Sequence, residues 1–494
     1  MNSRRHGEEV PSTSIAILGA GLSGVLMGMQ LRRAGIDDFV VIEKQPDIGG
    51  TWYRNTYPGL HCDVPSHLYC YSFEPNPDWS TRFASQQEIQ AYIRRCADKY
   101  DLPDRTRFGT CIESARYDEV EGCWELETAN GGRSSHRALV AATGGLTEPH
   151  IPPFPGLVEF EGPAWHSGAW REDVILEGKR VAVVGSAASA VQVVPEVARR
   201  AAEVHLFQRT PNWVMPRQNT AYTAQDRERL QDPEQMRRHW RELYRQSLTL
   251  HRVFHRHPGA VRTLRNVGLR NMRSAISDPA LLAALTPRYE PGCKRILVSD
   301  DYYPALALDH VTLHPQGVQA LTPTGVVAAD GSELPVDVAI FCTGYKLGGR
   351  VDGRPALEVF GRRGKRLLAA LAERPEAYRG VSVPGFPNYF TLCGINGVAA
   401  YTSLFASAEI QSEWVVDRLR DLHSGRYRTL EADGDACRRY NEAIQAELQT
   451  MSWAGDCPSF YRNASGRILS FFPGTLGRMR RELRAAGDSE IVVE

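Results

Sequence analysis

The chain has 494 residues, more than one hydrophobic core usually serves, so we expect two to four domains. Its 58 basic and 58 acidic residues give a formal net charge of zero without a long block of like charge. This argues against nucleic acid or a membrane surface as a partner bound by bulk electrostatics. No apolar run reaches the roughly 20 residues that a membrane-spanning helix needs.

The N-terminal residues and the cysteines suggest a protein of a reducing compartment. The first stretch, MNSRRHGEEVPSTS, is polar and lacks the apolar segment of a secretion signal. The ten cysteines are scattered, without a CxxC pair or the spacing of a zinc site. We therefore expect reduced thiols, no bound metal, no obligate protein partner and a cytoplasmic location.

Residues 14–35, SIAILGAGLSGVLMGMQLRRAG, have the order of a nucleotide-binding loop. A strand ending at Leu18 is followed by a turn through Gly19, Gly21 and Gly24, and then by an apolar-striped helix. These glycines let backbone amides and the positive end of the helix approach a pyrophosphate. The next strand, DFVVIEK, ends at Glu43, whose carboxylate can accept hydrogen bonds from ribose hydroxyls. This pattern predicts a dinucleotide with a free ribose, such as FAD.

Residues 160–170, FEGPAWHSGAW, combine three large aromatic side chains and a histidine with small residues. They show neither a helical nor a strand period and directly precede an apolar run that is typical of a buried strand. From the residues alone, we interpret this stretch as a packed linker that contains a core histidine.

Residues 181–192, VAVVGSAASAVQ, form a second nucleotide loop with a different pattern. Gly185 takes the first glycine position, while Ala187 and Ala190 stand at the second and third. The following strand, EVHLFQRT, places Arg209 at the same offset from Gly185 that Glu43 has from Gly19. A guanidinium at this position suits a 2′-phosphate and predicts NADPH, although a purely structural role for this loop remains an alternative.

Two further apolar runs, ALVAATGG (138–145) and VDVAIFCTGY (336–345), have the character of buried parallel strands and flank the second loop. The predicted fold is therefore α/β, with two nested Rossmann-like dinucleotide-binding domains and a mainly helical insertion. The expected boundaries are 1–148 for the first part of the FAD domain, 149–217 with 292–335 for the NADPH domain, 218–291 for the insertion, and 336–494 for the second part of the FAD domain with the C-terminal segment.

With both loops in place, the pattern Phe160-x-Gly162-x-x-x-His166-x-x-x-Trp170 resembles the fingerprint of the Baeyer-Villiger monooxygenases, flavoproteins that use FAD, NADPH and O₂. The resemblance extends over almost the whole chain and includes GGTWYRNTYPGLHCDVPSHLYCYSF (49–73), FQRTPNWVMP, CKRILVSDDYYPAL, FCTGY, PGFPNYF and CPSFYRNASGR. It implies that one atom of O₂ is inserted next to the carbonyl of a small ketone, and that residues 160–170 form a strap coupling domain rotation to cofactor contact.

The resemblance also implies the residues of the site. Arg295 would be the active-site arginine and Asp63 the aspartate that orients it, and both would contact cofactor. A guanidinium stays charged and can hydrogen-bond the nicotinamide amide without donating a proton. The implied flavin contacts are Thr51, Trp52, Tyr53, Arg54 and Tyr69, and the implied NADPH contacts are Ser186, Ala187, Ala188, Ser189, Ala190, Val191, Gln192, Arg209, Thr210 and Lys294.

Three positions depart from the family pattern. Ala187 adds a methyl group where the second glycine would meet phosphate, and Arg171 follows the fingerprint tryptophan where proline or aspartate is usual. Phe460 stands where the family often has tryptophan, in a tail segment that folds over the nicotinamide. Phenylalanine keeps the stacking surface and loses the indole N–H donor.

Three other functions share parts of this pattern. FCTGY also resembles a motif of amine hydroxylases, so an amine or sulfide could be the substrate of an N- or S-oxygenating flavin monooxygenase. A pyridine-nucleotide disulfide reductase would need two redox cysteines close together, and Cys62 with Cys70 is the only close pair. A non-catalytic flavoprotein would not need Arg295 and Asp63.

Overall fold

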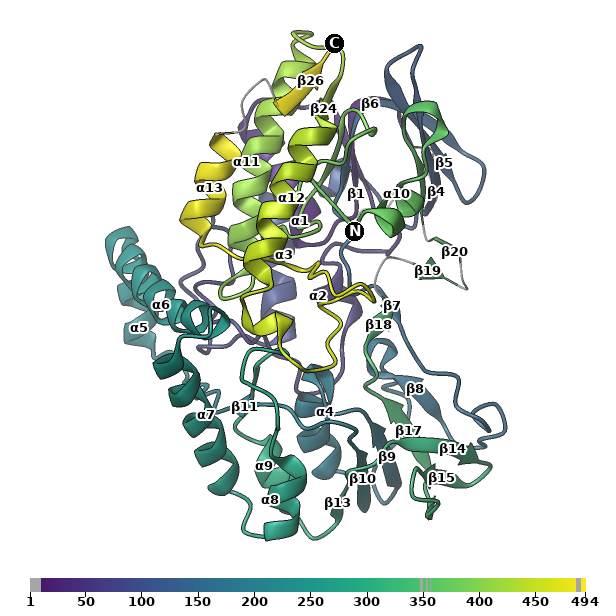
Figure 1. Cartoon of the computed structure of the whole chain (residues 1–494), viewed down its shortest axis with the longest axis vertical. Helices are drawn as coiled ribbons and strands as arrows, with labels where there is room; N and C mark the ends of the chain where they lie inside the picture. The colour runs from purple at the N-terminus through teal and green to yellow at the C-terminus, as the bar shows by residue number, and fades with distance from the viewer. Residues whose placement is uncertain (1–9, 347–349, 352–353, 356, 486–489) are drawn as a thin grey trace.

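The computed structural model describes residues 10–346, 350–351, 354–355, 357–485 and 490–494. Two sheets lie in separate halves of the molecule, one in the upper half of Figure 1 and one in the lower. The C-terminal segment, drawn in yellow, passes between the halves. Within the described residues, none of the helices has the length and apolar character needed to cross a membrane.

The first sheet is built around β1 (Thr13–Leu18), which lies parallel to both β2 (Phe39–Ile42) and β6 (Arg133–Ala141). Alternate residues of β1 face opposite sides of the sheet, and both sides are buried, which explains the unbroken apolar run. The strand order is β21-β4-β5-β6-β1-β2-β3, with β22 also paired to β6. The other strands are β3 (Thr106–Arg107), β4 (Ile112–Asp118), β5 (Cys123–Thr128), β21 (Glu358–Phe360) and β22 (Tyr389–Thr391).

Helices cover one face of this sheet. Ile15 and Ile17 of β1 belong to the same core cluster as residues of α1 and α11, and these two helices also contact each other. The helices of this half are α1 (Leu22–Arg33), α2 (Thr51–Arg54), α3 (Gln86–Lys99), α10 (Leu367–Glu373), α11 (Leu404–His423), α12 (Gly434–Leu448) and α13 (Leu476–Arg484).

The second sheet is parallel throughout and has the order β13-β10-β9-β17-β8. Its members are β8 (Ala164–His166), β9 (Arg180–Val184), β10 (Glu203–Phe207), β13 (Val311–His314) and β17 (Val338–Phe341). Helices α4 (Ala188–Ala198) and α9 (Tyr302–Leu306) pack beside it, and β14 (Val318–Thr322), β15 (Gly325–Ala328) and β16 (Glu333–Pro335) form a small antiparallel sheet.

Two differences from the sequence expectation concern this sheet. Strand β17 lies after residue 336, where the FAD domain was expected to resume, yet it pairs with β9, so the expected boundary falls too early. Residues 164–166, predicted as part of an irregular linker, pair with β17 as an edge strand. Three residues are too short for a period to be read from sequence.

The two connections between the halves lie side by side. β7 (Glu148–Pro149) pairs antiparallel with β18 (Tyr345–Lys346), and His150 N donates to Gly344 O at 2.9 Å. The chain therefore leaves the first sheet and returns to it through one two-stranded ribbon. The predicted α/β fold, with one parallel unit nested inside the other, is confirmed.

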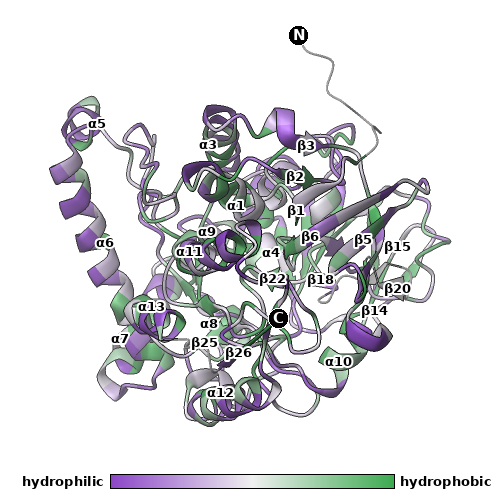
Figure 2. Cartoon of the chain, turned by 90° about the horizontal axis from the view of Figure 1, so that it is seen from above, coloured by the Kyte–Doolittle hydropathy of each residue, from purple (hydrophilic) through white to green (hydrophobic). Residues whose placement is uncertain are grey.

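The segment expected as a helical insertion is helical. It contains α5 (Ala224–Leu230), α6 (Pro233–Phe254), α7 (Pro258–Arg273) and α8 (Pro279–Leu285). Figure 2 shows α5 and α6 at the edge of the molecule, with many hydrophilic turns. The inner face of α6 contacts the C-terminal part of the chain, because the Tyr244 and Tyr401 hydroxyls lie 2.9 Å apart and His255 Nε2 lies 2.9 Å from Pro473 O.

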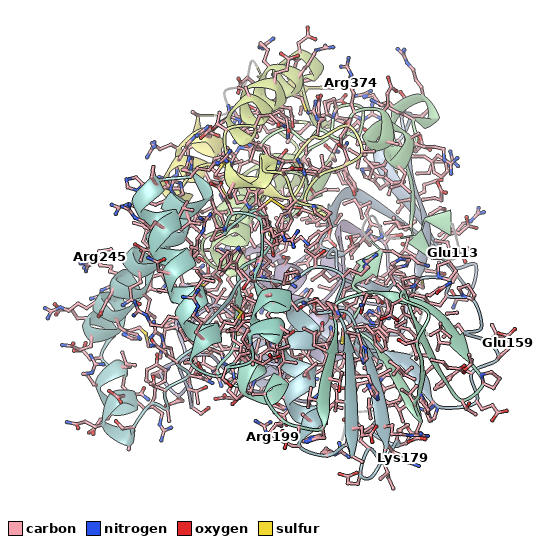
Figure 3. The ribbon with its side chains drawn as sticks, turned by 60° about the horizontal axis from the view of Figure 1, so that its bottom comes forward. Glu113, Glu159, Lys179, Arg199, Arg245 and Arg374 are labelled. Atoms are coloured by element: carbon pink, nitrogen blue, oxygen red, sulfur yellow. A yellow bond between two sulfur atoms is a disulfide. The ribbon has the colours of Figure 1, made fainter. Side chains whose placement is uncertain are left out.

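Short paired strands complete the structure, namely β11 (Val214–Met215) with β12 (Leu297–Val298), β19 (Arg350–Val351) with β20 (Arg354–Pro355), β23 (Val398–Ala399) with β25 (Phe471–Phe472), and β24 (Leu430–Ala432) with β26 (Ile491–Val493). Charged side chains lie at the periphery, as Figure 3 shows for the labelled Glu159, Lys179 and Arg199.

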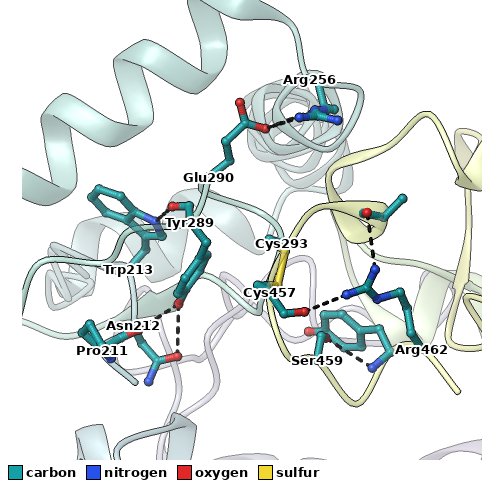
Figure 4. The surroundings of a disulfide bond; sticks show 12 residues. Pro211, Asn212, Trp213, Arg256, Tyr289, Glu290, Cys293, Cys457, Ser459 and Arg462 are labelled. Carbon is teal, nitrogen blue, oxygen red and sulfur yellow. Dashed lines mark hydrogen bonds and ion pairs between the residues drawn. A yellow bond between two sulfur atoms is a disulfide. The ribbon is translucent and has the colours of Figure 1, made fainter. Parts of the chain in front are cut away.

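A disulfide corrects the expectation that all cysteines are reduced. Cys293 and Cys457 are bonded, with their Cα atoms 6.3 Å apart and a sequence separation of 164 (Figure 4). Eight other cysteines in the described residues carry free thiols. The pair is not apparent from cysteine spacing, because only the fold brings the two segments together.

We predict that Cys457→Ser lowers stability. A disulfide closing a loop of this length restricts the unfolded chain, and its loss costs about 2–5 kcal/mol. Scanning calorimetry should show a lower Tm for Cys457→Ser, and dithiothreitol should lower the Tm of the unmodified protein but not that of the variant. An unmodified protein whose Tm is insensitive to reductant would contradict the prediction.

Three buried histidines, His67, His136 and His166, and the half-buried His251 predict acid sensitivity. Burial lowers the pKa of His67 to about 3 and those of His136, His166 and His251 to about 4, from 6.5 in the unfolded chain. The unfolded chain binds protons that the folded protein does not, so stability is fully present above pH 6.5 and is lost as pH falls toward 4. We expect Tm to drop between pH 6.5 and 4.5. His136→Gln should weaken that dependence, whereas the exposed His423→Gln should leave it unchanged.

Candidate active site

The first nucleotide loop approaches the end of a parallel strand so closely that a side chain is excluded. Gly19 has φ +100°, and a Cβ there would lie 2.7 Å from Ala142 O, just beyond β6. A Cβ on Gly24 would meet Gly19 O at 1.8 Å. Gly21, by contrast, has extended backbone, and a Cβ there would meet only Gly50 Cα, at 3.6 Å. The first and third glycines are therefore needed by the fold, and the second keeps space open for a ligand.

The second loop repeats this geometry. Gly185 has φ +110°, and a Cβ there would lie 2.4 Å from Cys342 O, just beyond β17. Ala187 has φ −87° and ψ −158°, close to the −73° and −174° of Gly21. Alanine therefore fits the backbone without strain, and its methyl group changes only the space above the loop. The fully buried Ala190 is accommodated in the helix where Gly24 could not be replaced.

Both helices that follow these loops begin without a side-chain cap. Gly21 and Ala187 are the N-cap residues of α1 and α4, and neither provides a capping hydrogen bond. Ser85, Asp232 and Ser403 cap α3, α6 and α11. The first backbone N–H groups of α1 and α4 are therefore free of side-chain caps, as expected where a pyrophosphate binds.

Glu43 lies immediately after β2 and is oriented by backbone amides. Its two carboxylate oxygens accept hydrogen bonds from Ala20 N at 2.7 Å and Gln45 N at 2.8 Å, and the residue is 6% exposed. Burial raises the pKa of Glu43, although these hydrogen bonds oppose the shift. The carboxylate is fixed beside the first loop and retains lone pairs for ribose hydroxyls.

The residues expected along the flavin occupy α2 and the loop after it. Trp52 and Tyr69 are buried together, with Trp52 Nε1 donating to the Tyr69 hydroxyl at 3.0 Å. Thr51 is exposed, and Tyr53 and Arg54 are half-buried. Trp52 and Tyr69 thus form a packed wall, while the other three present accessible surface.

The N-terminal end of α4 lies against the first half of the molecule. Gln192 Nε2 donates to His61 O at 2.9 Å, and the Tyr57 hydroxyl donates to Gln192 Oε1 at 3.2 Å. The Ser186 hydroxyl donates to Thr210 O at 3.2 Å. The Ala190 and Val191 side chains are in the core, so only their backbone could meet a ligand, whereas Ala187 and Ala188 are exposed.

Two cations lie near each other at the second loop. Arg209 is exposed and lies shortly after β10. The half-buried Lys294 has its Nζ 5.2 Å from the ring centroid of Tyr289. Burial lowers the pKa of Lys294, and the charge of Arg209 lowers it further. Two neighbouring cations such as Arg209 and Lys294 attract a phosphate.

Arg295 and Asp63 come from segments far apart in sequence and meet in the structure. Arg295 Nε donates to Asp63 Oδ2 at 2.7 Å, and Nη2 lies 2.5 Å from the same oxygen. The charge of Asp63 raises the pKa of Arg295, although burial opposes the shift. The Arg295 side chain is 48% exposed, so the cation is accessible.

The fingerprint segment is anchored by its aromatic rings. Phe160 packs in the core of the second sheet, and Trp165 and Trp170 form an edge-on pair with centroids 5.6 Å apart. His166 Nδ1 accepts a hydrogen bond from Gly168 N at 2.9 Å, and its ring lies 5.3 Å from that of Tyr345. Since burial lowers its pKa to about 4, His166 is neutral near pH 7.

Two buried residues of this region were not predicted from the sequence. Tyr57 and Tyr461 are buried at the joint, whereas Phe460, predicted to stack on nicotinamide, is 61% exposed. Tyr461 follows Phe460 directly, so the CPSFYRN motif indicated the segment but not the residue. Arg171, which departs from the family pattern, forms an ion pair with Asp173 at the surface.

Cys62 and Cys70 do not form a redox pair. Both are buried free thiols, and burial raises the pKa of Cys62 strongly and that of Cys70 to about 12. A disulfide reductase needs an accessible thiolate, which these positions do not provide.

The two loops fit two dinucleotides, one with a free ribose and one with a ribose 2′-phosphate. The first has uncapped helix amides, space above Gly21 and an adjacent carboxylate, as FAD requires. The second has uncapped helix amides and two adjacent cations, as NADPH requires.

Comparisons with known proteins agree with this geometry. The family model for flavin-binding monooxygenase-like proteins matches residues 12–227. A Baeyer-Villiger monooxygenase of Pseudomonas aeruginosa is 40% identical, and the match covers 94% of this chain and 88% of that protein.

Solved structures match along the full chain. Cyclohexanone monooxygenase from Rhodococcus sp. Phi1 bound to NADP⁺ superposes with a TM-score of 0.87 at 26% identity, covering 99% of this chain and all of that one. The OTEMO complex with FAD and NADP gives 0.86 at 26% identity, covering 98% and 100%. The chain belongs to the Baeyer-Villiger monooxygenases, within the flavin-binding monooxygenase-like family.

Proposed function

We propose that this FAD- and NADPH-dependent monooxygenase inserts one oxygen atom of O₂ beside the carbonyl of a small ketone, giving an ester or lactone. The observation that carries the proposal is the Arg295–Asp63 pair, a permanent cation that is held by a carboxylate and is still accessible. The structural relatives include a cyclohexanone monooxygenase, which supports a ketone as the substrate class.

The chemistry assigned to Arg295 is electrostatic. Asp63 takes two of the guanidinium N–H groups on a single oxygen, which leaves other donors directed elsewhere. Negative charge that develops on the ketone oxygen is stabilised by a fixed cation in a protected site. Because its pKa is raised, Arg295 stays charged and supplies hydrogen bonds without releasing a proton.

The remaining site residues bind and orient. When bound, FAD and NADPH supply the electrons and the activation of O₂. We assign Glu43 to the FAD ribose, the amide ends of α1 and α4 to the two pyrophosphates, and Arg209 with Lys294 to the 2′-phosphate. Thr51, Tyr53 and Arg54 offer accessible surface along the flavin, against the wall formed by Trp52 and Tyr69.

Arg295→Ala should separate reduction from oxygen insertion. We expect NADPH to reduce the bound flavin as in the unmodified enzyme, while ester formation falls by about 10²–10³-fold, the cost of removing one such donor. A panel of cyclic, linear and aryl ketones with product analysis would measure this, with Arg133→Ala, 82% exposed, as the control. Undiminished ester yield would refute the role of Arg295. Oxidation of amines or sulfides without any ester would favour heteroatom oxygenation.

Arg209→Ala should weaken coenzyme selectivity. If the guanidinium binds the 2′-phosphate, its removal raises KM for NADPH by about tenfold or more and changes KM for NADH little, because NADH lacks that group. Steady-state kinetics with both coenzymes measure the effect, and Lys294→Ala should act in the same direction. An equal rise in both KM values would contradict the assignment.

A further inference from the structure

Tyr345 lies where the ribbon between the halves meets both the first half and the fingerprint segment. It belongs to β18 and pairs with Pro149 of β7. Figure 1 shows this ribbon close to α2, the helix whose residues we assign to the flavin. The Tyr345 side chain is half-buried, and burial raises the pKa of its phenol. The hydroxyl is therefore protonated near pH 7 and can donate a hydrogen bond.

The hydroxyl of Tyr345 holds the residue that ends α2. It donates to Asn55 Oδ1 at 2.6 Å, and Asn55 Nδ2 donates to Thr51 O at 2.9 Å. Asn55 is the C-cap of α2 and is 4% exposed. A buried amide that uses its oxygen for one partner and its N–H for another is fixed in one orientation. Tyr345 and the flavin-side helix are thus linked through a single side chain.

The same tyrosine contacts the fingerprint segment. Its ring lies edge-on to the ring of His166, with centroids 5.3 Å apart. Gly168 is buried, and a Cβ there would lie 2.5 Å from the Tyr345 hydroxyl, so glycine leaves the space that this hydroxyl occupies. His166 is the last residue of β8, which pairs with β17 of the second sheet. These contacts therefore reach the half that we assign to NADPH.

We propose that Tyr345 is a positioning residue for the reduction of the flavin: its ring and hydroxyl align the fingerprint segment of the second half with α2 of the first. The proposal rests on the cofactor assignments made above. In the reaction, NADPH gives a hydride to the flavin and leaves as NADP⁺. A misplacement of reacting groups by about 1 Å can cost about 10²-fold in rate, so the alignment of the two halves affects this step directly.

Tyr345→Phe isolates the hydroxyl, because the ring that faces His166 is kept. In the FAD-loaded enzyme, we expect the rate constant for flavin reduction by NADPH to fall about tenfold, measured by anaerobic stopped-flow absorbance. Ester formed per NADPH oxidised should not change, since Arg295 and Asp63 are intact. Tyr378→Phe is the matched control and should keep the unmodified rate, because the buried Tyr378 donates to Glu490 within the first half.

Gly168→Ala tests the same contact from the fingerprint side. Its methyl group would displace the Tyr345 hydroxyl, so this variant should also slow flavin reduction. In the double variant with Tyr345→Phe, the hydroxyl is already absent. Flavin reduction should then be no slower than in Tyr345→Phe alone. Effects that multiply in the double variant would contradict the proposal.

A double-mutant cycle supplies a readout that does not need turnover. Tyr345→Phe and Asn55→Ala are made singly and together, and unfolding by urea is measured for all four proteins. The hydrogen bond predicts that the double variant loses less stability than the sum of the two single losses, whereas Tyr378→Phe with Asn55→Ala should be additive.

Two results would overturn the proposal, namely additive stability effects of Tyr345→Phe and Asn55→Ala, or flavin reduction in Tyr345→Phe at the unmodified rate. Failure of the proposed function gives a different result. An unmodified enzyme that NADPH reduces, but that forms no ester from any ketone of the panel, would overturn the ketone assignment, while slow flavin reduction in Tyr345→Phe would still support the role of Tyr345.

Discussion

The structure depends on the contact between a left-handed glycine and the carbonyl at the end of a neighbouring parallel strand. Gly19 meets Ala142 O in the first sheet, and Gly185 meets Cys342 O in the second. Each contact fixes where a helix begins relative to its sheet, and so directs free backbone N–H groups at one place. The two sites share this construction and differ in the side chain that follows the next strand, Glu43 in one and Arg209 in the other.

Between these two sites, polar contacts join the halves. Gln192 of α4 binds Tyr57 and His61 of the first half, and Arg295 binds Asp63 from the same region. The residues that we assign to the coenzyme and those that join the halves are therefore neighbours on the same elements. A change in the position of α4 relative to the loop at 57–63 would act on both together.

The sequence was informative wherever chemistry lies in a local pattern. Both nucleotide loops, the positions of Glu43 and Arg209 after the next strands, the helical insertion, and the contact between Arg295 and Asp63 implied by the family resemblance occur where they were expected. Contacts between segments far apart in sequence could not be predicted. Cys293 and Cys457 are 164 positions apart, and the assignment of β17 to the second sheet depends on its pairing with β9, which no local pattern indicates. Phe460, which stands at the family's aromatic position, is 61% exposed, and the sequence alone could not show that exposure.

The paired ribbon of β7 and β18 determines how the halves can move. Because both chain connections cross at one edge, a rotation about that line would stretch neither of them. The disulfide adds a third covalent link, from the segment before Arg295 to the tail. When the disulfide is formed, it closes the backbone into a ring that passes through both halves. The length of chain in this ring limits how far the halves could rotate. Oxidation of Cys293 and Cys457 therefore joins the half that contains the second sheet covalently to the tail, in addition to the ribbon of β7 and β18.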